Sequence, residues 1–316
     1  MSKYLVTGGA GFIGSNIVRE LVGLGHEVVI VDDYSTGSMS NLAGLLDKVR
    51  IIEGNICSKY IVRTALDGVD YVLHQAALPS IARSVADPIA TNCVQVDGTV
   101  NLLWAACQAG VKRVVFAGSS SIYGDSETLP KLETMMPEPK SPYAVSKLAS
   151  EYYCKVFHQI YDLETTVLRY FNVFGPYQNF ASHYSAVVPL FINAARSGEE
   201  VVIYGDGEQS RDFTYVSNVV DANLKAVLSE AAVGRTMNVA CGVRTSLLEM
   251  LGMVEEILGC SIPRRHLPAR VGDVLHSQAD ISKARELIGY EPTVNLRQGL
   301  ERTIEFFAAQ GKVPGF

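Results

Sequence analysis

The sequence predicts an α/β fold in which a doubly wound parallel sheet carries a smaller α/β domain. Three observations predict it. Short apolar runs alternate with helical patterns along the first half, and a glycine-rich turn joins the first strand to the first helix. Loop-rich segments that carry arginines follow Phe174. With 316 residues, 48% of them hydrophobic, the chain can bury the cores of one large and one smaller domain.

The first half justifies the parallel sheet element by element. Strands are predicted over Lys3 to Thr7, Glu27 to Asp32, the region of Arg50, Val69 to His74, Arg113 to Gly118 and Thr165 to Val173. Helices are predicted over Phe12 to Val22, Pro88 to Ala109 and Tyr143 to Tyr161. Continuously apolar strands joined by long helical crossovers fit a parallel sheet that is covered on both faces.

The second half predicts a discontinuous smaller domain. The stretches GPYQNFASHYS, GEEVVIYGDGEQSRDF and PRRHLPARVGD are typical of substrate-facing insertions. Val216 to Cys241 returns to a helix followed by a strand, which can rejoin the large sheet. We therefore expect the large domain to comprise residues 1–173 and 217–241, and the smaller domain residues 174–216 and 242–316.

Charge and cysteine usage exclude several classes of function. A formal charge of -6 and a pI near 5.6 supply no basic surface, so neither a nucleic acid nor a membrane partner is expected. No stretch reaches membrane-spanning length. The six cysteines show neither a CxxC nor a His-paired spacing, so no metal site and no disulfide framework is predicted. Buried thiols in a reducing cytoplasm are the preferred interpretation.

The glycine turn and the acid that follows it indicate a dinucleotide site. Thr7 to Gly14 reads TGGAGFIG, which places Gly8, Gly11 and Gly14 between a strand and a helix. Small residues let the backbone approach a pyrophosphate, and the positive end of the helix stabilises its charge. Asp32 ends the second strand, where a carboxylate accepts hydrogen bonds from an adenosine ribose and repels a 2'-phosphate. NAD is therefore favoured over NADP, and a helix or turn cap is the alternative role of Asp32.

Tyr143 and Lys147 form the candidate catalytic pair. Their i, i+4 spacing places both side chains on one face of the helix that begins near Ser141 and Pro142. A nearby ammonium and an oxidised nicotinamide would both favour the phenolate over the phenol, whose ordinary pKa is about 10. A hydroxyl of the three serines that follow Gly118, Ser119 first among them, can share a proton with a sugar hydroxyl. The alternative is that the pair is exposed and the serines form a polar turn.

These motifs, together with HQAA, SSSIYGD, SPYAVSK and RYFNVFGP, make the chain resemble the extended short-chain dehydrogenase/reductase family, and within it the UDP-sugar 4-epimerases. The resemblance runs from Gly8 to about Gly289. It implies a Rossmann-type NAD-binding domain and a smaller UDP-sugar-binding domain. It also implies a cytoplasmic homodimer packed through the helices at Pro88 to Ala109 and Tyr143 to Tyr161.

The resemblance implies a set of NAD contacts. They are Gly8, Gly11, Phe12, Ile13, Gly14, Asp32, Asp33, Ser35, Thr36, Gly37, Asn55, Ile56, Gln75, Ala76, Ala77, Gln95, Tyr143, Lys147 and Tyr170. The family usually has Asp where Asn55 stands and Asn where Gln95 stands, and both replacements can still hydrogen-bond adenine or ribose.

The resemblance also implies contacts with the UDP-sugar. They are Ser120, Ser121, Tyr143, Asn172, Ala186, Val187, Tyr204, Arg211, Arg270, Asp273 and Ser277. Arg211 and Arg270 make physical sense, because a guanidinium fork matches phosphate oxygens. A solvated surface arginine is the alternative.

Residues absent from the site narrow the activity that the resemblance implies. Related dehydratases have Asp-Glu after the position of Ser119, and related decarboxylases have Glu at the position of Ser121. Uronate enzymes have an arginine after Gly-Pro, whereas this chain has GPYQNF. Ser277 stands where epimerases restricted to UDP-glucose and UDP-galactose carry Tyr, so it leaves room for an N-acetyl group, unless it only packs in a turn.

We therefore expect NAD-dependent C4 epimerisation of a UDP-hexose through a 4-keto sugar, with Tyr143, Lys147 and Ser119 as the catalytic residues. UDP-N-acetylglucosamine is the expected substrate, and UDP-glucose is a further one. A UDP-glucuronate 4-epimerase, a reductase or dehydrogenase that consumes NAD(H), and a catalytically silent binding protein are the alternatives.

Overall fold

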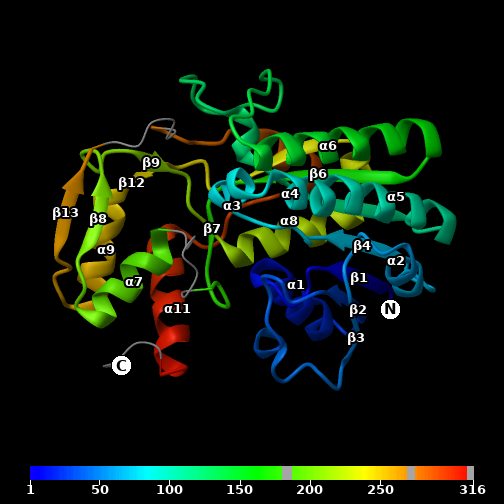
Figure 1. Cartoon of the computed structure of the whole chain (residues 1–316), viewed down its shortest axis with the longest axis horizontal. Coiled ribbons are helices and arrows are strands. Elements are labelled where there is room, and N and C mark those ends of the chain that lie inside the picture. The colour runs from blue at the N-terminus through cyan, green and yellow to red at the C-terminus, as the bar shows by residue number, and fades with distance from the viewer. Residues whose placement is uncertain (180–186, 269–274, 312–316) are drawn as a thin grey trace.

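A seven-stranded parallel sheet forms the centre of the computed structural model, which describes residues 1–179, 187–268 and 275–311 (Figure 1). The strands lie in the order β11-β6-β5-β4-β1-β2-β3. Their bounds are β1 (Lys3–Thr7), β2 (Glu27–Asp32), β3 (Val49–Glu53), β4 (Tyr71–His74), β5 (Arg113–Ser119), β6 (Glu164–Tyr170) and β11 (Thr236–Val239). The winding reverses between β1 and β4, so the predicted doubly wound Rossmann-type fold is confirmed.

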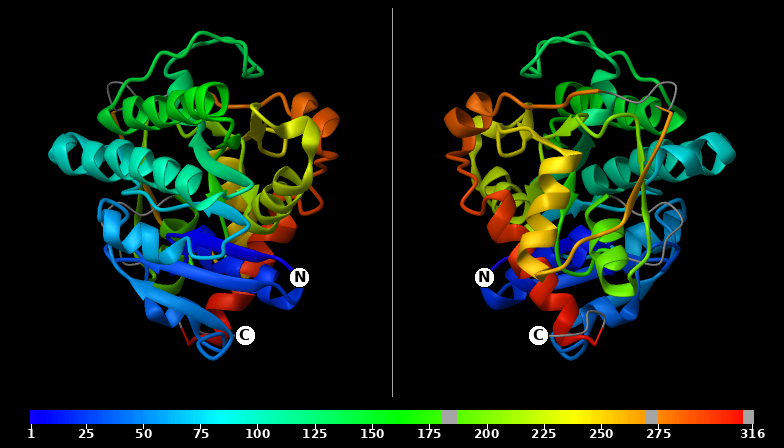
Figure 2. Two further views of the ribbon diagram at one scale, coloured as in Figure 1. Left: turned by 90° about the vertical axis from the view of Figure 1, so that its right-hand side faces the viewer. Right: turned by 90° about the vertical axis from the view of Figure 1, so that its left-hand side faces the viewer.

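Helices cover both faces of this sheet (Figure 2). On one face, the apolar side chains of α1 (Phe12–Gly23), α8 (Val216–Leu228) and α10 (Ser282–Ile288) form one core cluster with the strands. On the other face, α2 (Lys59–Ala65), α5 (Gly98–Ala109) and α6 (Pro142–Tyr161) form a second cluster. Since both faces are buried, the strands need to be apolar along their whole length, as the sequence is.

Two predicted elements are divided in the structure. The predicted strand over Thr165 to Val173 ends at Tyr170, because the chain turns at Asn172, whose φ is 25°. β7 (Val173–Phe174) then pairs with β10 (Thr214–Tyr215) outside the large sheet. The predicted helix over Pro88 to Ala109 consists of α4 (Pro88–Asn92), a π-helical turn η2 (Cys93–Asp97) and α5. α3 (Ile81–Ala86) precedes α4.

The remaining elements build a second, smaller core. They are α7 (Val187–Ser197), β8 (Val201–Tyr204), β9 (Ser210–Arg211), β12 (Thr245–Ser246), α9 (Leu247–Leu258), β13 (Arg264–Leu267) and α11 (Leu296–Ala309). Side chains of α7, β8, α9 and α11 pack together as a third cluster. Ala279, Ala284 and Tyr290 pack in the core of the large sheet instead. The division at residues 173, 216 and 241 stays a prediction.

Short 3-10 turns η1 (Met39–Leu42), η3 (Ser120–Tyr123) and η4 (Glu230–Ala232) complete the described elements. In the part of the chain that the structure describes, no helix combines the length and apolar character needed to cross a bilayer. Within the same residues, no group of three or more His, Cys, Asp or Glu side chains is arranged to hold a metal ion. All six cysteines are free thiols.

Candidate active site

The glycine turn is shaped by close backbone contacts. Gly8 has a φ of 68°, and a Cβ on it would lie 2.8 Å from the backbone of Ala76. A Cβ on Gly14 would lie 2.1 Å from the Gly8 carbonyl oxygen, so α1 can begin this close to β1 only with glycine there. The first amides of α1 therefore face the cavity at the carboxyl edge of the sheet, where an anion is favoured.

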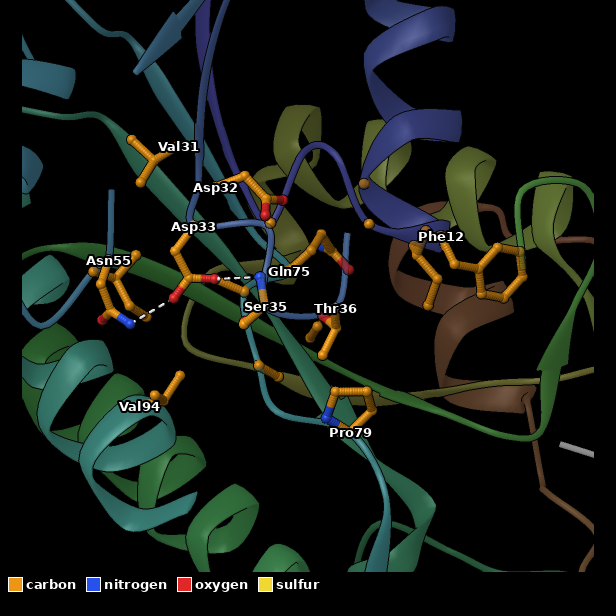
Figure 3. A pocket seen from close by; sticks show the side chains of 18 of the residues that line it. Phe12, Val31, Asp32, Asp33, Ser35, Thr36, Asn55, Gln75, Pro79 and Val94 are labelled. Atoms are coloured by element: carbon orange, nitrogen blue, oxygen red, sulfur yellow. Dashed lines mark hydrogen bonds between the residues drawn. The ribbon is translucent and has the colours of Figure 1, made fainter. Parts of the chain in front are cut away.

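The acid at the end of β2 supports this turn directly. Asp32 is buried, and its carboxylate accepts hydrogen bonds from the Ala10 amide (2.9 Å) and the Tyr34 amide (2.9 Å). Burial raises the pKa of Asp32, and these two amides act in the opposite direction. Asp33 is more exposed, and its carboxylate accepts from the Asn55 side-chain amide (2.6 Å) and the Ser35 amide (3.0 Å) (Figure 3). Two carboxylates thus stand at one end of the cavity.

This first cavity runs along the carboxyl ends of β1, β2, β4 and β5, with about 940 Å³ of empty space, including space open to solvent. A dinucleotide fits a cleft of that size. All the residues expected to contact NAD line it, except Gly37 and Gln95. Gly37 packs against the Ala10 carbonyl below the glycine turn. Gln95 is buried between α5 and α6, where its amide donates to the Ser146 hydroxyl.

The candidate catalytic pair lies in the first turns of α6. Ser141 caps this helix by accepting from the Ala144 amide (3.2 Å), and Pro142 occupies its first position. The Lys147 ammonium donates to the Ala117 carbonyl (2.9 Å) and lies 4.9 Å from the centre of the Phe116 ring. The capped start and this bond fix the helix against β5, so Tyr143 and Lys147 both face the cavity.

Burial shifts the pKa values of both members of this pair. Burial raises the pKa of the Tyr143 phenol, and a hydrogen bond with the Ser119 side chain opposes that rise. Burial lowers the pKa of Lys147 to about 8. Loss of solvation is the larger of the two effects on Tyr143, and it acts against the phenolate. The protein's own groups keep the phenol protonated at neutral pH.

Tyr170 and Gln75 are held by a residue that sequence reasoning missed. The Asn223 amide, on α8, donates to the Tyr170 hydroxyl (2.8 Å) and its oxygen accepts from the Gln75 amide (3.2 Å). Burial raises the pKa of Tyr170 to about 12, so this phenol stays protonated. Burial thus keeps Tyr170 protonated as it does Tyr143, and the hydrogen bonds of the Tyr170 hydroxyl with Asn223 and Gln75 hold it in the cavity wall.

A second cavity lies on the other side of Tyr143, with about 1110 Å³ of empty space, including space open to solvent. Five of the expected substrate contacts line it besides Tyr143: Ser120, Ser121, Asn172, Arg211 and Ser277. Ser119 lines it too, with its hydroxyl 2.8 Å from that of Ser121. Among the described residues of this wall, Arg211 and Lys131 carry positive charge and no carboxylate is present. The lining suits an anionic ligand.

Other expected substrate contacts lie elsewhere. Val187 begins α7 and Tyr204 ends β8, and neither belongs to the described wall of the second cavity. Ala186, Arg270 and Asp273 lie outside the described residues.

Several residues that line the two cavities were not among the expected contacts. In the first cavity they are Val31, Gly54, Pro79, Val94, Ala117 and Gly118. In the second they are Ile81, Gly118, Tyr123, Gly124, Lys131 and Val173, and Ile13 and Tyr170, expected only as NAD contacts, line this cavity too. The sequence offered a signal for some of them: Ala117 and Gly118 end the strand that leads into the serines, and Tyr123, Gly124 and Val173 lie in the motifs SSSIYGD and RYFNVFGP.

Asp212 is a further buried support that sequence reasoning missed. Its carboxylate accepts from the amides of Cys241 (2.9 Å), Gly242 (3.0 Å) and Ala279 (3.1 Å). Burial raises its pKa to about 7, against the effect of these three amides. Because Asp212 follows Arg211 and binds the segment that carries Ser277, it fixes two parts of the second cavity to each other.

The two cavities share one wall. Ile13, Gly118, Tyr143 and Tyr170 line both of them. A group bound in one cavity can therefore meet a group bound in the other only beside these residues, among which Tyr143 is the candidate acid/base residue. The arrangement suits a reaction between a dinucleotide and a second, anionic ligand.

Comparison with known proteins identifies the family. The profile of the NAD dependent epimerase/dehydratase family matches residues 4–240. The chain belongs to this family. Its cofactor is accordingly NAD, and the glycine turn, the two carboxylates and the cavity size fit that dinucleotide.

Relatives within the NAD dependent epimerase/dehydratase family have different activities. A UDP-glucose 4-epimerase of Mycolicibacterium smegmatis is 39% identical over 96% of this chain and 98% of its own length. A UDP-N-acetyl-alpha-D-glucosaminuronate decarboxylase of Bacillus cytotoxicus is 33% identical over 96% and 97%. The UDP-N-acetylglucosamine 4-epimerase of Methanobrevibacter ruminantium, in complex with UDP-N-acetylmuramic acid, is 38% identical, with a TM-score of 0.94 over 98% and 99% of the two chains.

Proposed function

We propose that the protein catalyses the reversible C4 epimerisation of a UDP-hexose. UDP-N-acetylglucosamine and UDP-N-acetylgalactosamine are the proposed pair, with UDP-glucose and UDP-galactose as further substrates. One observation carries the proposal: the Tyr143 phenol lies in the wall shared by the NAD cavity and the positively charged second cavity. The 4-epimerases among the relatives support it.

Tyr143 and Ser119 handle the proton in this proposal. Both side chains line the second cavity, and Ser119 acts to lower the pKa of Tyr143, so a proton of the sugar C4 hydroxyl can pass through Ser119 to the Tyr143 phenolate. Hydride chemistry at C4 is what NAD supplies when bound, so the reaction goes through a 4-keto sugar without an external oxidant. The Lys147 ammonium is held by its hydrogen bond to the Ala117 carbonyl. In this proposal it would position the nicotinamide end of the bound dinucleotide. Since the protein alone keeps Tyr143 protonated, the charged cofactor has to favour its ionisation.

The second cavity supports a UDP-sugar as the ligand. Arg211 is positioned by its bonds to the carbonyls of Ser210 (2.9 Å) and Leu275 (3.2 Å), and a guanidinium there suits a diphosphate. Ser277 lines the same cavity with a small side chain, which leaves space for a substituent on the sugar. The diphosphate stays anchored while the keto sugar turns and presents its other face.

The described wall of this site lacks the acidic residues that dehydratases and decarboxylases of the family would need. The described wall beside Tyr143 has Ser119, Ser120 and Ser121, and no carboxylate that could serve elimination or decarboxylation. The position after Gly-Pro is Tyr177, whose ring packs against Phe306 (4.5 Å between centroids) and Arg19 (4.5 Å). A ring held in this way supplies no cation for a sugar carboxylate, which favours a neutral hexose over a uronate.

The test is incubation of the purified protein with UDP-N-acetylglucosamine and UDP-glucose separately, without added NAD, followed by chromatographic separation of the C4 epimers. We expect both substrates to epimerise, the N-acetylated one faster. Turnover of UDP-glucuronate alone would replace the proposal by uronate epimerisation. A requirement for stoichiometric NAD(H) would replace it by a one-way dehydrogenase or reductase, and no turnover would favour a silent binding protein.

We also propose that the enzyme is a cytoplasmic homodimer. One face of α6 exposes Val145, Tyr152, Val156 and Ile160, with exposed fractions of 52%, 52%, 39% and 65%. The exposed Trp104 of the neighbouring α5 lies 5.6 Å from the ring of Tyr161 and extends the same apolar surface. A second copy that packs α5 and α6 against these helices would bury this surface in a four-helix bundle.

A further inference from the structure

Two free thiols meet beside the NAD cavity. Cys57, in the loop between β3 and α2, and Cys93, in the turn η2, have their sulfur atoms 3.6 Å apart. The Cys57 thiol also donates to the Cys93 carbonyl oxygen (3.2 Å), so its side chain points at that residue. The two residues are 36 positions apart in the sequence, and no sequence pattern indicated the pair.

The two segments are packed tightly together. The Asn101 amide donates to the Ile56 carbonyl (2.7 Å), and a Cβ on Gly98 would lie 2.8 Å from the Ile56 side chain. These contacts hold the backbones of the two segments at the separation that brings the two thiols together. To form a disulfide, the sulfurs need only approach from 3.6 Å to about 2 Å, which rotation of the side chains can supply.

The neighbours of both cysteines belong to the cofactor site. Ile56 follows Asn55 and precedes Cys57, and Val94 follows Cys93; all three of these neighbours line the NAD cavity. Asn55 and Val94 lie on the same side of the cavity in Figure 3, below Asp33. The cysteines themselves are not part of the cavity wall. A covalent bond between them would tie two segments of the wall together from outside.

We propose that Cys57 and Cys93 form an oxidation site, in which a disulfide closes this end of the cavity and slows the exchange of NAD. Cys93 is exposed and Cys57 is half-buried, so an oxidant reaches Cys93 first. Burial and the neighbouring Cys93 raise the pKa of Cys57 to about 12, which makes it the less reactive thiol until its partner is activated.

The chemistry needs a hydroperoxide as the oxidant. The Cys93 sulfur attacks the peroxide oxygen, the O–O bond breaks, and a sulfenic acid and an alcohol, or water from hydrogen peroxide, are formed. The Cys57 sulfur then attacks the Cys93 sulfur, and the S–O bond breaks with release of water, which takes up the Cys57 proton. Two thiols lose two electrons to the peroxide in total. A thiol reductant reverses the step by disulfide exchange.

The experiment treats the NAD-loaded protein with hydrogen peroxide, alkylates the remaining thiols and digests with trypsin. We expect residues 51–59 to be recovered linked to residues 84–112, and reductant to separate them. Because Cys107 lies in the second peptide, Cys93→Ser is needed, and it should abolish the link. Cys260→Ser, which removes an exposed thiol elsewhere, should leave it unchanged. A link that survives in Cys93→Ser, or oxidation of Cys93 to a sulfinic acid without a link, would overturn the site.

The release of NAD tests the consequence independently of catalysis. The oxidised protein is mixed with an excess of an NAD-consuming enzyme, and the loss of bound dinucleotide is followed with time. We expect release about tenfold slower than from the reduced protein, because the cross-link removes opened conformations of the wall. In Cys57→Ser and Cys93→Ser, peroxide should leave the rate unchanged. Equal rates before and after formation of the disulfide would overturn the proposed effect on exchange.

Discussion

At the scale of single residues, the proposed chemistry depends on Tyr143 and on the groups that set its proton affinity. The phenol is bonded to Ser119 and lies in the wall of both cavities. Its neighbour Lys147 is buried and has a pKa lowered to about 8. Both groups therefore carry an energetic cost of burial that a surface pair would not carry.

Replacement of Tyr143 by Phe removes the hydroxyl and leaves the ring in place. We expect kcat for epimerisation to fall about 10³-fold, because general acid/base catalysis is lost. Affinity for NAD and for UDP, measured by calorimetry, should change by less than about twofold, since the ring still packs in the wall. Tyr153→Phe, on an exposed position of the same helix, is the matched control and should keep its activity. Normal turnover by the Tyr143 variant would remove this residue from the mechanism.

From the burial of Lys147 we predict that this residue is needed for activity but lowers the stability of the folded protein. Its pKa in the folded protein is about 8, below its ordinary value of 10.5, so the folded state disfavours the charged form. This cost is fully present below pH 8 and disappears as pH rises towards 10.5, where the unfolded chain also loses the proton. Lys147→Met should raise the free energy of unfolding at pH 7 by about 2 kcal/mol and abolish turnover.

Urea unfolding without NAD, at several pH values, measures the effect of Lys147. The difference between variant and wild type should be largest below pH 8 and vanish near pH 10.5. A variant that is less stable than wild type at pH 7 would show that the bond from Lys147 to the Ala117 carbonyl outweighs the burial of charge.

Ser277 is predicted to decide the size of the sugar substituent. Ser277→Tyr should lower kcat/KM for UDP-N-acetylglucosamine by about 10²-fold while UDP-glucose is still used, because a filled pocket excludes the larger group. Ser277→Ala keeps the volume and should retain both substrates. Steady-state kinetics with the two sugars measure the ratio. An unchanged ratio in Ser277→Tyr would mean that this side chain only packs in its turn.

At the scale of elements, α6 is connected to the second cavity by a buried polar network. Glu151, one turn after Lys147, binds the Arg169 guanidinium of β6 through two bonds (2.6 and 3.0 Å). Arg169 donates to the Tyr123 hydroxyl (2.7 Å), which in turn donates to Asn238 of β11 (2.7 Å). Tyr123 lines the second cavity. The helix that carries the candidate catalytic pair therefore also positions a wall of the second cavity.

Breaking this ion pair should affect substrate binding as well as stability. Glu151→Gln leaves the Arg169 charge buried without its counter-ion, and we expect a loss of about 3 kcal/mol in the free energy of unfolding. KM for the UDP-sugar should rise several-fold, with NAD affinity unchanged, as Tyr123 shifts. Glu164→Gln is the control. It removes one of the two ion pairs of another buried arginine, Arg113, at the start of β5, and Glu230 remains as the partner of that arginine. Equal KM values in the two variants would show a purely structural role.

At the scale of the whole molecule, two surfaces matter: the junction of the two cavities and the apolar face of α6. The cavities meet where the smaller core packs against the carboxyl edge of the large sheet, so the proposed substrate and the cofactor would approach from different parts of the chain. The face of α6 lies on the far side of the sheet from α8. An interface there would leave both cavities accessible.

If the dimer forms through α5 and α6, a charged side chain placed in this interface should break it. Val156→Glu should convert the protein from dimer to monomer in sedimentation velocity experiments, because an unpaired carboxylate would be buried between the helices. Leu24→Glu, at an exposed apolar position after α1, is the matched control and should leave the dimer intact. A wild-type protein that sediments as a monomer at micromolar concentration would contradict the proposal.

The sequence by itself determined the local features of the fold. Apolar strands and helical spacings show the order of β1 to β6, because strand and helix periods can be read from neighbouring residues. The breaks at Asn172 and at the turn η2 were not predictable. The first depends on a positive φ at a non-glycine residue. The second depends on a hydrogen bond from the Gly98 amide to the carbonyl of Cys93, five residues earlier in the chain. Neither leaves a mark in the hydrophobic pattern.

For the site, the sequence likewise determined what lies close along the chain: the glycine turn, Asp32, the serines after β5 and the i, i+4 pair of α6. Only the tertiary structure decided which distant residues join them. Asn223, Asp212, Tyr123 and the contact of Cys57 with Cys93 depend on the order of strands and on helix packing. Spacing along one element fixes a face, but contact between elements is fixed by how the whole sheet assembles, and that is not a local property of the chain.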